Sequence, residues 1–294
     1  MTKTISKTKM LAAVAAMGAA AAMQPAHAID VDAGDYTALP AGTNLGLVYY
    51  QHAQRNALYG NGNKAPGNNK LNSDVGILRG VHFMDIGGYI VDPQFLLPFG
   101  KLQAKGDLGP VLGSGSGVGD LILAATVWLT KPGEKTHFGI TPFIVAPTGK
   151  YDKNEALNLG ENRWKFILQG GYITPLSEKV LLDVVGDVTL FGKNKDAPGG
   201  TLKQDAQYQA QTFLRYQLAP TSDVRVGLSH TWGGDTRVNG VDQNSKQRTT
   251  KYHVGFSHFL GAKTQVLATV GRDGSVENGF RENARVNLRL LQIF

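Results

Sequence analysis

The C-terminal stretch Asn-Ala-Arg-Val-Asn-Leu-Arg-Leu-Leu-Gln-Ile-Phe, residues 283–294, alternates apolar and polar side chains. Its apolar set comprises Ala284, Val286, Leu288, Leu290 and Phe294, and Arg285, Asn287 and Arg289 lie between them. A period of two puts these two sets on opposite faces of a β-strand. We therefore expect a strand with one apolar face and one charged face, which ends on an aromatic residue.

The same alternation recurs upstream, at residues 182–190, 207–218, 224–232 and 251–260. In each of these stretches, the face opposite the apolar one carries charged, amide or glycine residues. A soluble β-sandwich hides its apolar faces in a protein core, whereas a barrel with lipid outside and a polar lumen divides every strand in this way. The pattern predicts an all-β fold, a transmembrane antiparallel β-barrel.

Twelve strands can be placed, and an even number is typical of single-chain bacterial barrels. They are expected at residues 42–53, 73–85, 88–99, 119–130, 136–147, 163–174, 179–191, 206–218, 223–234, 249–260, 264–272 and 282–294. Short turns alternate with longer loops, expected at 54–72, 100–118, 148–162, 192–205, 235–248 and 273–281. This alternation predicts short periplasmic turns and longer extracellular loops.

Three tryptophans lie near predicted strand ends, where barrels carry girdles of interfacial aromatic residues. Trp128 precedes a short turn, and Trp164 and Trp232 lie beside long loops. We expect all three in the girdles, although Trp128 shares a face with Asp120 in this register.

The first 28 residues have the three regions of a secretory signal peptide. Lysines at positions 3, 7 and 9 precede an alanine-rich apolar run at 11–23, and Ala26-His27-Ala28 is a small-x-small cleavage site. A membrane anchor or a buried helix is the alternative, but the run is short and rich in alanine. We expect cleavage after Ala28, a periplasmic or lumen-plugging segment at 29–41, and a barrel at 42–294.

Composition excludes several kinds of chemistry. The chain contains no cysteine, so it can form neither a disulfide nor a thiolate site. Its formal charge is +7, but the basic residues are spread along the chain, which argues against nucleic-acid binding. The glycine-rich stretch 113–119 lacks the phosphate-loop pattern, and the spacing of His82, Asp74 and Asp85 does not favour a metal site. We expect no cofactor.

A hydrolase with a Ser/His pair is the alternative function. Ser229-His230 and Ser257-His258 are adjacent in sequence, and adjacent residues on a strand point to opposite faces, so neither pair can hydrogen-bond locally. A cross-strand pair remains open, and such a pair at the level of the outer leaflet would favour an outer-membrane lipid hydrolase. We predict that the protein is not an enzyme.

Four motifs carry a family resemblance. They are DYTALPAGTNLGLVYY at 35–50, GVGDLIL at 117–123, TPFIVAPTGKYD at 141–152 and NLGENRW at 158–164. In this order they resemble the outer-membrane channel family linked to the meta-pathway of phenol degradation. The resemblance implies a monomer in contact with outer-membrane lipid, uptake of small organic molecules, and no catalytic residues. The terminal Phe294 resembles the export signature of outer-membrane barrels, which predicts recognition by the barrel-assembly machinery, although Gln292 departs from that signature.

Alternation also predicts which charged side chains face the lumen. The set is Lys165, Asp183, Asp187, Arg215, Arg225, Lys251, Arg285 and Arg289, together with Asp120. A positive excess in a narrow pore attracts anions, so we expect a passive channel for small organic acids or weakly polar aromatics. Residues 29–40 or the loop 100–118 are the candidate gates. The alternative is that Arg285 and Arg289 pair with Asp183 and Asp187 and only brace the barrel.

Overall fold

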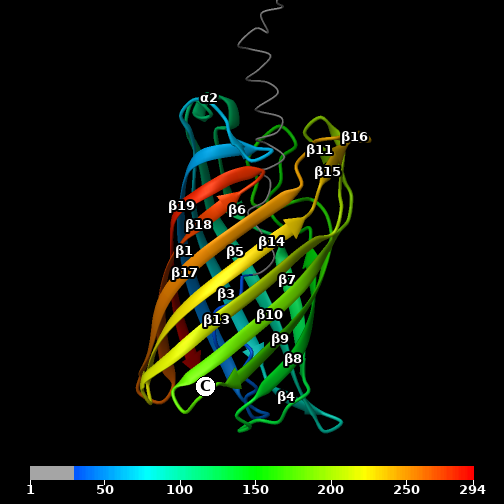
Figure 1. Ribbon diagram of the computed structural model, residues 1–294. Coiled ribbons are helices and arrows are strands. Elements are labelled where there is room, and N and C mark those ends of the chain that lie inside the picture. Colours follow the sequence, from blue (N-terminus) through cyan, green and yellow to red (C-terminus); the bar gives the residue numbers. More distant parts are fainter. Residues whose placement is uncertain (1–29) are drawn as a thin grey trace, which may run out of the picture.

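The alternating stretches form one antiparallel sheet that closes on itself, because β19 pairs with β1 as well as with β18. This computed structural model describes residues 30–294 (Figure 1). Twelve strands build the barrel: β1 (Asn44–Gly60), β3 (Asn69–His82), β5 (Tyr89–Gly106), β7 (Leu121–Trp128), β8 (His137–Ala146), β9 (Lys165–Pro175), β10 (Val180–Phe191), β13 (Gln207–Ala219), β14 (Ser222–Gly233), β17 (Gln247–Leu260), β18 (Thr264–Val276) and β19 (Gly279–Ile293). The predicted fold class and strand number are confirmed. The predicted signal peptide lies outside the described residues.

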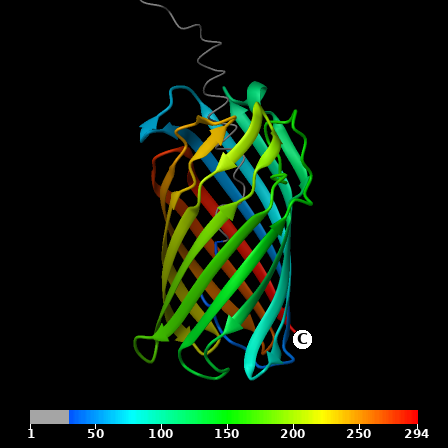
Figure 2. The same ribbon diagram turned by 90° about the vertical axis from the view of Figure 1, so that its right-hand side faces the viewer.

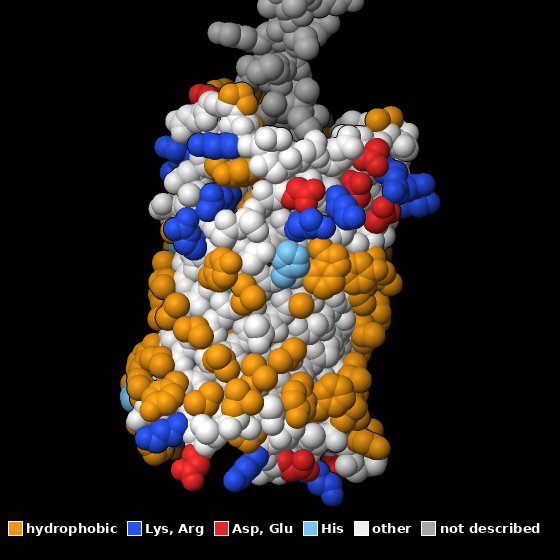
Figure 3. All heavy atoms as spheres, viewed as in Figure 1, with side chains coloured by type: hydrophobic (Ala, Val, Ile, Leu, Met, Phe, Trp, Pro, Cys, Tyr) orange, Lys and Arg blue, Asp and Glu red, His pale blue; other side chains and the backbone are white. Residues whose placement is uncertain are grey.

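The outer wall of the barrel is apolar and the inner wall is polar. On β19, Leu288 and Leu290 are each 47% exposed, whereas Arg289 between them is 7% exposed. Figure 3 shows the apolar side chains as a belt across the face in view, with charged side chains gathered above it and at its lower rim. This division matches lipid outside and a polar lumen. Over residues 30–294, the structure contains no helix long and apolar enough to cross a membrane.

The two ends of the barrel differ. Tight turns and the C-terminus lie at one end, and the long connections rise from the other (Figure 2). By the usual orientation of such barrels, the first end is periplasmic and the second extracellular.

Several long connections contain regular structure where irregular loops were expected. β5 continues to Gly106, the short helix α2 (Gly109–Leu112) follows, and β6 (Ser114–Val118) pairs back onto β5. Two other connections form a second small sheet from β11 (Asn194–Ala197), β12 (Gly200–Gln204), β15 (Thr236–Val238) and β16 (Val241–Asp242). The remaining short strands are β2 (Asn63–Lys64), which pairs with β1, and β4 (Met84–Ile86), which pairs with β5. Glycine- and lysine-rich sequence thus extends several hairpins above the apolar belt.

Pro98 of β5 lies where the ladder changes partner. β5 pairs with β7 as far as Leu96 and with β6 from Phe99 onward. Pro98 lies between the two ladders, where a missing N–H donor is tolerated. Its carbonyl still accepts a hydrogen bond from the backbone N–H of Gly119 at 2.8 Å.

The expectation that Trp128 belongs to an interfacial girdle is wrong. Its side chain is 2% exposed, points into the barrel, and donates from Nε1 to Asp92 Oδ2 at 2.9 Å. The indole N–H needs a partner when it is buried, and Asp92 supplies one. Trp164 and Trp232 are exposed, and Trp232 stacks on Tyr208 with ring centroids 5.7 Å apart.

Candidate functional site

The segment before β1 runs inside the barrel. Tyr36 and Ala38 pack against the inner wall, in a buried cluster that includes Leu47, Phe83 and Trp128. At the foot of the segment, the Gly42 N–H donates to the Phe83 carbonyl at 2.7 Å before β1 begins. The segment therefore occupies the periplasmic half of the lumen.

Tyr36 is seated in a notch of the wall. Its hydroxyl lies 2.9 Å from Thr141 Oγ1 and donates to Gln169 Oε1 at 3.0 Å. Its ring lies over Gly171 of β9, where an added Cβ would be only 2.1 Å from the ring. Only glycine leaves room for this contact, so Gly171 positions the segment.

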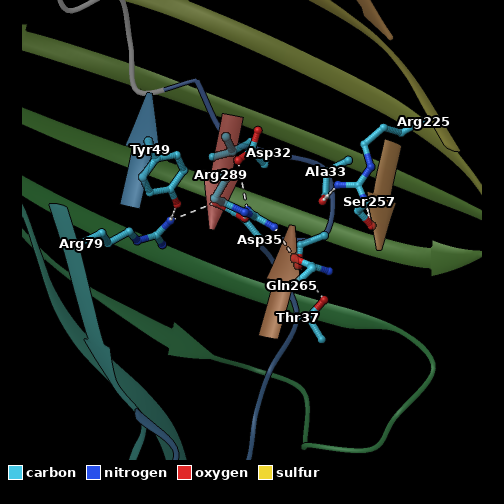
Figure 4. A network of polar contacts seen from close by, with 12 residues as sticks. Asp32, Ala33, Asp35, Thr37, Tyr49, Arg79, Arg225, Ser257, Gln265 and Arg289 are labelled. Atoms are coloured by element: carbon cyan, nitrogen blue, oxygen red, sulfur yellow. Dashed lines mark hydrogen bonds and ion pairs between the residues drawn. The ribbon is translucent and has the colours of Figure 1, made fainter. Parts of the chain in front are cut away.

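Two aspartates of the segment bind arginines of the wall (Figure 4). Arg289 Nη1 lies 2.6 Å from Asp35 Oδ1 and 3.0 Å from Asp32 Oδ2. Arg79 Nη1 donates to the other oxygen of Asp35 at 3.0 Å and to the Tyr49 hydroxyl at 3.1 Å. Burial alone would raise the pKa of Asp35, but Arg289 and Arg79 hold that pKa below its ordinary value. Asp35 is therefore ionised at neutral pH.

A third aspartate of the segment binds higher in the lumen. Asp30 Oδ2 lies 3.0 Å from Arg285 Nη1 and 3.3 Å from Lys251 Nζ, and Gln209 Nε2 donates to Asp30 Oδ1 at 2.9 Å. Glu282 on the wall also binds Arg285, at 2.7 Å. Asp30 thus attaches the upper part of the segment to β13, β17 and β19.

The backbone of the segment is also bound. Arg225 Nη1 donates to the Ala33 carbonyl at 2.7 Å, and the Gly34 N–H donates to Asp183 Oδ2 at 2.6 Å. Arg215 Nε in turn donates to Asp183 Oδ1 at 3.0 Å. Gly34 has φ +92°, a conformation that side chains other than glycine rarely adopt.

The structure places the residues expected at the lumen in two groups. Five of them contact the segment 30–36 directly, as described above: Asp183, Arg225, Lys251, Arg285 and Arg289. Arg215 belongs with them because it binds Asp183. Asp187 accepts a hydrogen bond from Gln169 at 3.3 Å, and Lys165 lies near the extracellular end, 2.6 Å from Glu161. Arg285 and Arg289 pair with Asp30, Asp32, Asp35 and Glu282 rather than with Asp183 and Asp187. The three aspartates of the segment offset much of the positive charge expected from the strands alone.

A cavity of about 350 Å³ remains beside the segment. Aromatic and aliphatic side chains, among them Phe213, Phe143 and Leu267, line it together with charged groups. The ring of His253 lies 4.9 Å from that of Phe213, and its buried Nε2 has no hydrogen-bond partner among the described residues. The cavity thus offers aromatic surfaces for stacking, close to a ring nitrogen that has no hydrogen-bond partner among the described residues.

Three of the four motifs of the family resemblance, at 117–123, 141–152 and 158–164, meet at the extracellular end. Asp120 accepts hydrogen bonds from the backbone N–H groups of Gly149 and Glu161, each at 2.9 Å. Gly149 and Gly160 touch backbone to backbone, since a Cβ on Gly160 would lie 2.7 Å from the Gly149 carbonyl carbon. Burial opposes ionisation of Glu161, but Lys165 and Arg163 hold its pKa below the ordinary value.

These contacts of Asp120, Gly149 and Gly160 fold the connection between β8 and β9 inward. Leu157 and Leu159 pack with Leu108 and Leu112 of the α2 region in a buried apolar cluster. Sequence reasoning missed Arg79, Glu161 and Glu282 as site residues. Glu161 lies outside a strand, where alternation gives no signal. Around Arg79, the glycines at positions 76 and 80 interrupt the apolar–polar alternation, so the sequence does not show whether its side chain points into or out of the barrel.

The structure contains a cross-strand Ser/His pair, but at the other end of the barrel. Ser222 Oγ lies 2.8 Å from His258 Nδ1, at the end with the tight turns, and His258 stacks on Phe256. Among the described residues, no carboxylate binds His258. The hydrolase alternative required such a pair at the outer-leaflet level. Residues 30–294 also contain no cluster of side chains suited to a metal ion.

The closed barrel, its apolar outer wall and its polar lumen define an outer-membrane β-barrel channel. A crystal structure of an outer-membrane channel from Pseudomonas putida F1 is similar, with 43% identity, a TM-score of 0.87, and coverage of 90% of this chain and 100% of that one. The chain belongs to the family described as "Putative MetA-pathway of phenol degradation", whose profile matches residues 55–290. The family resemblance and the outer-membrane location expected from the sequence are confirmed.

A more distant likeness concerns the fold alone. The transport unit of the autotransporter AIDA-I from Escherichia coli shares 8% identity at a TM-score of 0.51, over 96% of this chain and 97% of that one. Curated proteins give no match to the chain.

Proposed function

We propose that this channel admits small organic molecules by passive diffusion past the segment 30–36, without catalysing a reaction. The observation that carries the proposal is the polar lumen, which is crossed by a segment held at three aspartates and one tyrosine. Movement of this segment would widen the path, while the strands stay fixed in a closed ladder.

The cavity beside the segment supports a permeant class. Phe213, Phe143 and His253 offer ring surfaces. Arg225 and Arg289, which bind the segment in this structure, would offer donors for a carboxylate or hydroxyl group when the segment moves away. Aromatic rings stack on such surfaces, and arginine binds carboxylates in a defined geometry. The permeants we propose are small aromatic compounds and organic acids, which agrees with a family named for phenol degradation.

Single-channel recording in planar bilayers tests the proposal. The comparison is between the processed wild type and a variant whose mature chain lacks residues 29–36. We expect the variant to show a severalfold higher conductance, because the segment leaves the lumen. Heat-modifiable migration on gels must be equal in both proteins, so that a change in conductance reports the lumen. Equal conductance in two equally folded barrels would overturn the proposed path.

We also propose that the channel works as a monomer and that the assembly machinery recognises β19. Phe294 supports the second point, because its backbone N–H donates to the Asn44 carbonyl at 3.0 Å while its ring remains 71% exposed. Mass measurement of the detergent-purified protein tests the oligomeric state.

A further inference from the structure

The outward face of β1, β3 and β5 changes from apolar to cationic within a few residues along the strands, toward the extracellular end. These strands lie side by side (Figure 1), and their register aligns Tyr50, Gly76 and Phe99 in one outward row. Tyr50 and Phe99 are 45% and 40% exposed, and the Phe99 ring covers Gly76. Exposed aromatic residues at this position mark the upper interface of the membrane.

Polar rows follow directly above this aromatic row. The next row pairs Asp74 with Lys101, and the one above it pairs Asn72 with Gln103. The uppermost row places Lys70 directly opposite Lys105. Opposed side chains on antiparallel strands have Cβ atoms about 5 Å apart, and like charges so placed are destabilising.

Among the described residues, the three lysines of this face form no salt bridge, although Lys101 lies opposite Asp74. Among the described residues, no carboxylate lies within 4.0 Å of Lys70, Lys101 or Lys105. Asp74 is already engaged, since Tyr50 donates to it at 2.8 Å and His52 lies 2.7 Å away. Two other exposed cations of the upper barrel form salt bridges: Arg237 with Asp205 at 2.8 Å and Arg248 with Glu277 at 3.6 Å.

We propose that this face binds the phosphorylated glucosamine headgroup of lipid A, the lipid of the outer leaflet. The Lys70–Lys105 row and Lys101 are about 14 Å apart along β5, from four residues at about 3.4 Å each, comparable to the length of a disaccharide with a phosphate at each end. Asn72 and Gln103 lie between them and suit the sugar hydroxyl and amide groups. Below, Tyr50 and Phe99 face the acyl chains. Bound phosphate relieves the repulsion between Lys70 and Lys105.

Thermal unfolding in detergent tests the site. Full-length mature protein, refolded without lipopolysaccharide, is titrated with purified bisphosphorylated lipid A in mixed micelles, and the temperature of gel-shift unfolding is recorded. We expect lipid A to raise this temperature in the wild type. Each lysine near an anionic headgroup contributes roughly fivefold to binding, so Lys70→Gln with Lys105→Gln should raise the half-saturating concentration about 25-fold. The matched control is Lys179→Gln with Lys263→Gln, at exposed turns of the periplasmic end.

The unfolding temperature of the variant without lipid A distinguishes lysines that bind lipid A from lysines that only stabilise the barrel. In the absence of lipid A, the Lys70/Lys105 variant should unfold at the same temperature as the wild type or a higher one, because a repulsion is removed. If the variant's unfolding temperature were lowered equally with and without lipid A, the lysines would be stabilising the barrel itself, and the proposal would fail. It would also fail if wild type showed no shift, if the control pair lost the shift equally, or if inorganic phosphate at equal phosphorus concentration reproduced it.

Discussion

At the scale of single residues, the contact between Tyr36 and Gly171 decides where the N-terminal segment can lie. A methyl group at position 171 would approach the Tyr36 ring to 2.1 Å, so Gly171→Ala must displace the ring and its hydrogen bonds to Thr141 and Gln169. We expect a higher single-channel conductance with an intact barrel, because alanine is otherwise tolerated in a strand. Gly170→Ala is the matched control, since nothing lies within 4 Å of a Cβ at that position. Equal conductance in the two variants would contradict the positioning role of Gly171.

At the scale of elements, β19 completes the barrel and carries the end of the chain. It pairs with β18 and β1, and the Phe294 ring packs against Gly46, 3.2 Å from the position of a Cβ there. Deletion of Phe294 removes this contact and its backbone hydrogen bond to Asn44 at the seam of the barrel. We expect a smaller heat-modifiable fraction in outer membranes, measured by gel and immunoblot. Phe294→Tyr keeps the ring and should assemble normally. Normal assembly of the deletion variant would refute a role for the terminal ring.

At the scale of the whole molecule, the charge of the lumen is a balance between the wall and the segment inside it. Asp30, Asp32 and Asp35 face Arg285 and Arg289, so the wild type should show only weak ion selectivity. Loss of the segment removes these acids, and the truncated channel should become anion-selective in reversal-potential measurements. Adding Arg285→Ala and Arg289→Ala to the truncated channel should shift its selectivity back toward cations. If neither the truncation nor the added arginine substitutions change ion selectivity, the wall arginines only stabilise the barrel and do not act on permeating ions.

Much of the architecture follows from the sequence, because alternation is a local property. Leu288 and Arg289 are neighbours, and a strand must direct them to opposite faces, one toward lipid and one toward the interior. The twelve strands, the tight turns and the outer-membrane fold follow from repeating this rule. Family membership was also predictable, because four short motifs occur in a fixed order.

The partners of each lumen residue follow from the tertiary structure alone. The meeting of Arg289 with Asp35, and of Asp120 with Gly149 and Glu161, depends on closure of the barrel and on the path of non-strand segments. Those segments have no periodicity, so the sequence carries no local signal of their direction. Trp128 shows the same principle, since its nearness to a turn suggested the membrane interface, while its strand face and the buried carboxylate of Asp92 directed it inward. Alternation determines the face of a side chain, and only the closed structure determines what that side chain meets.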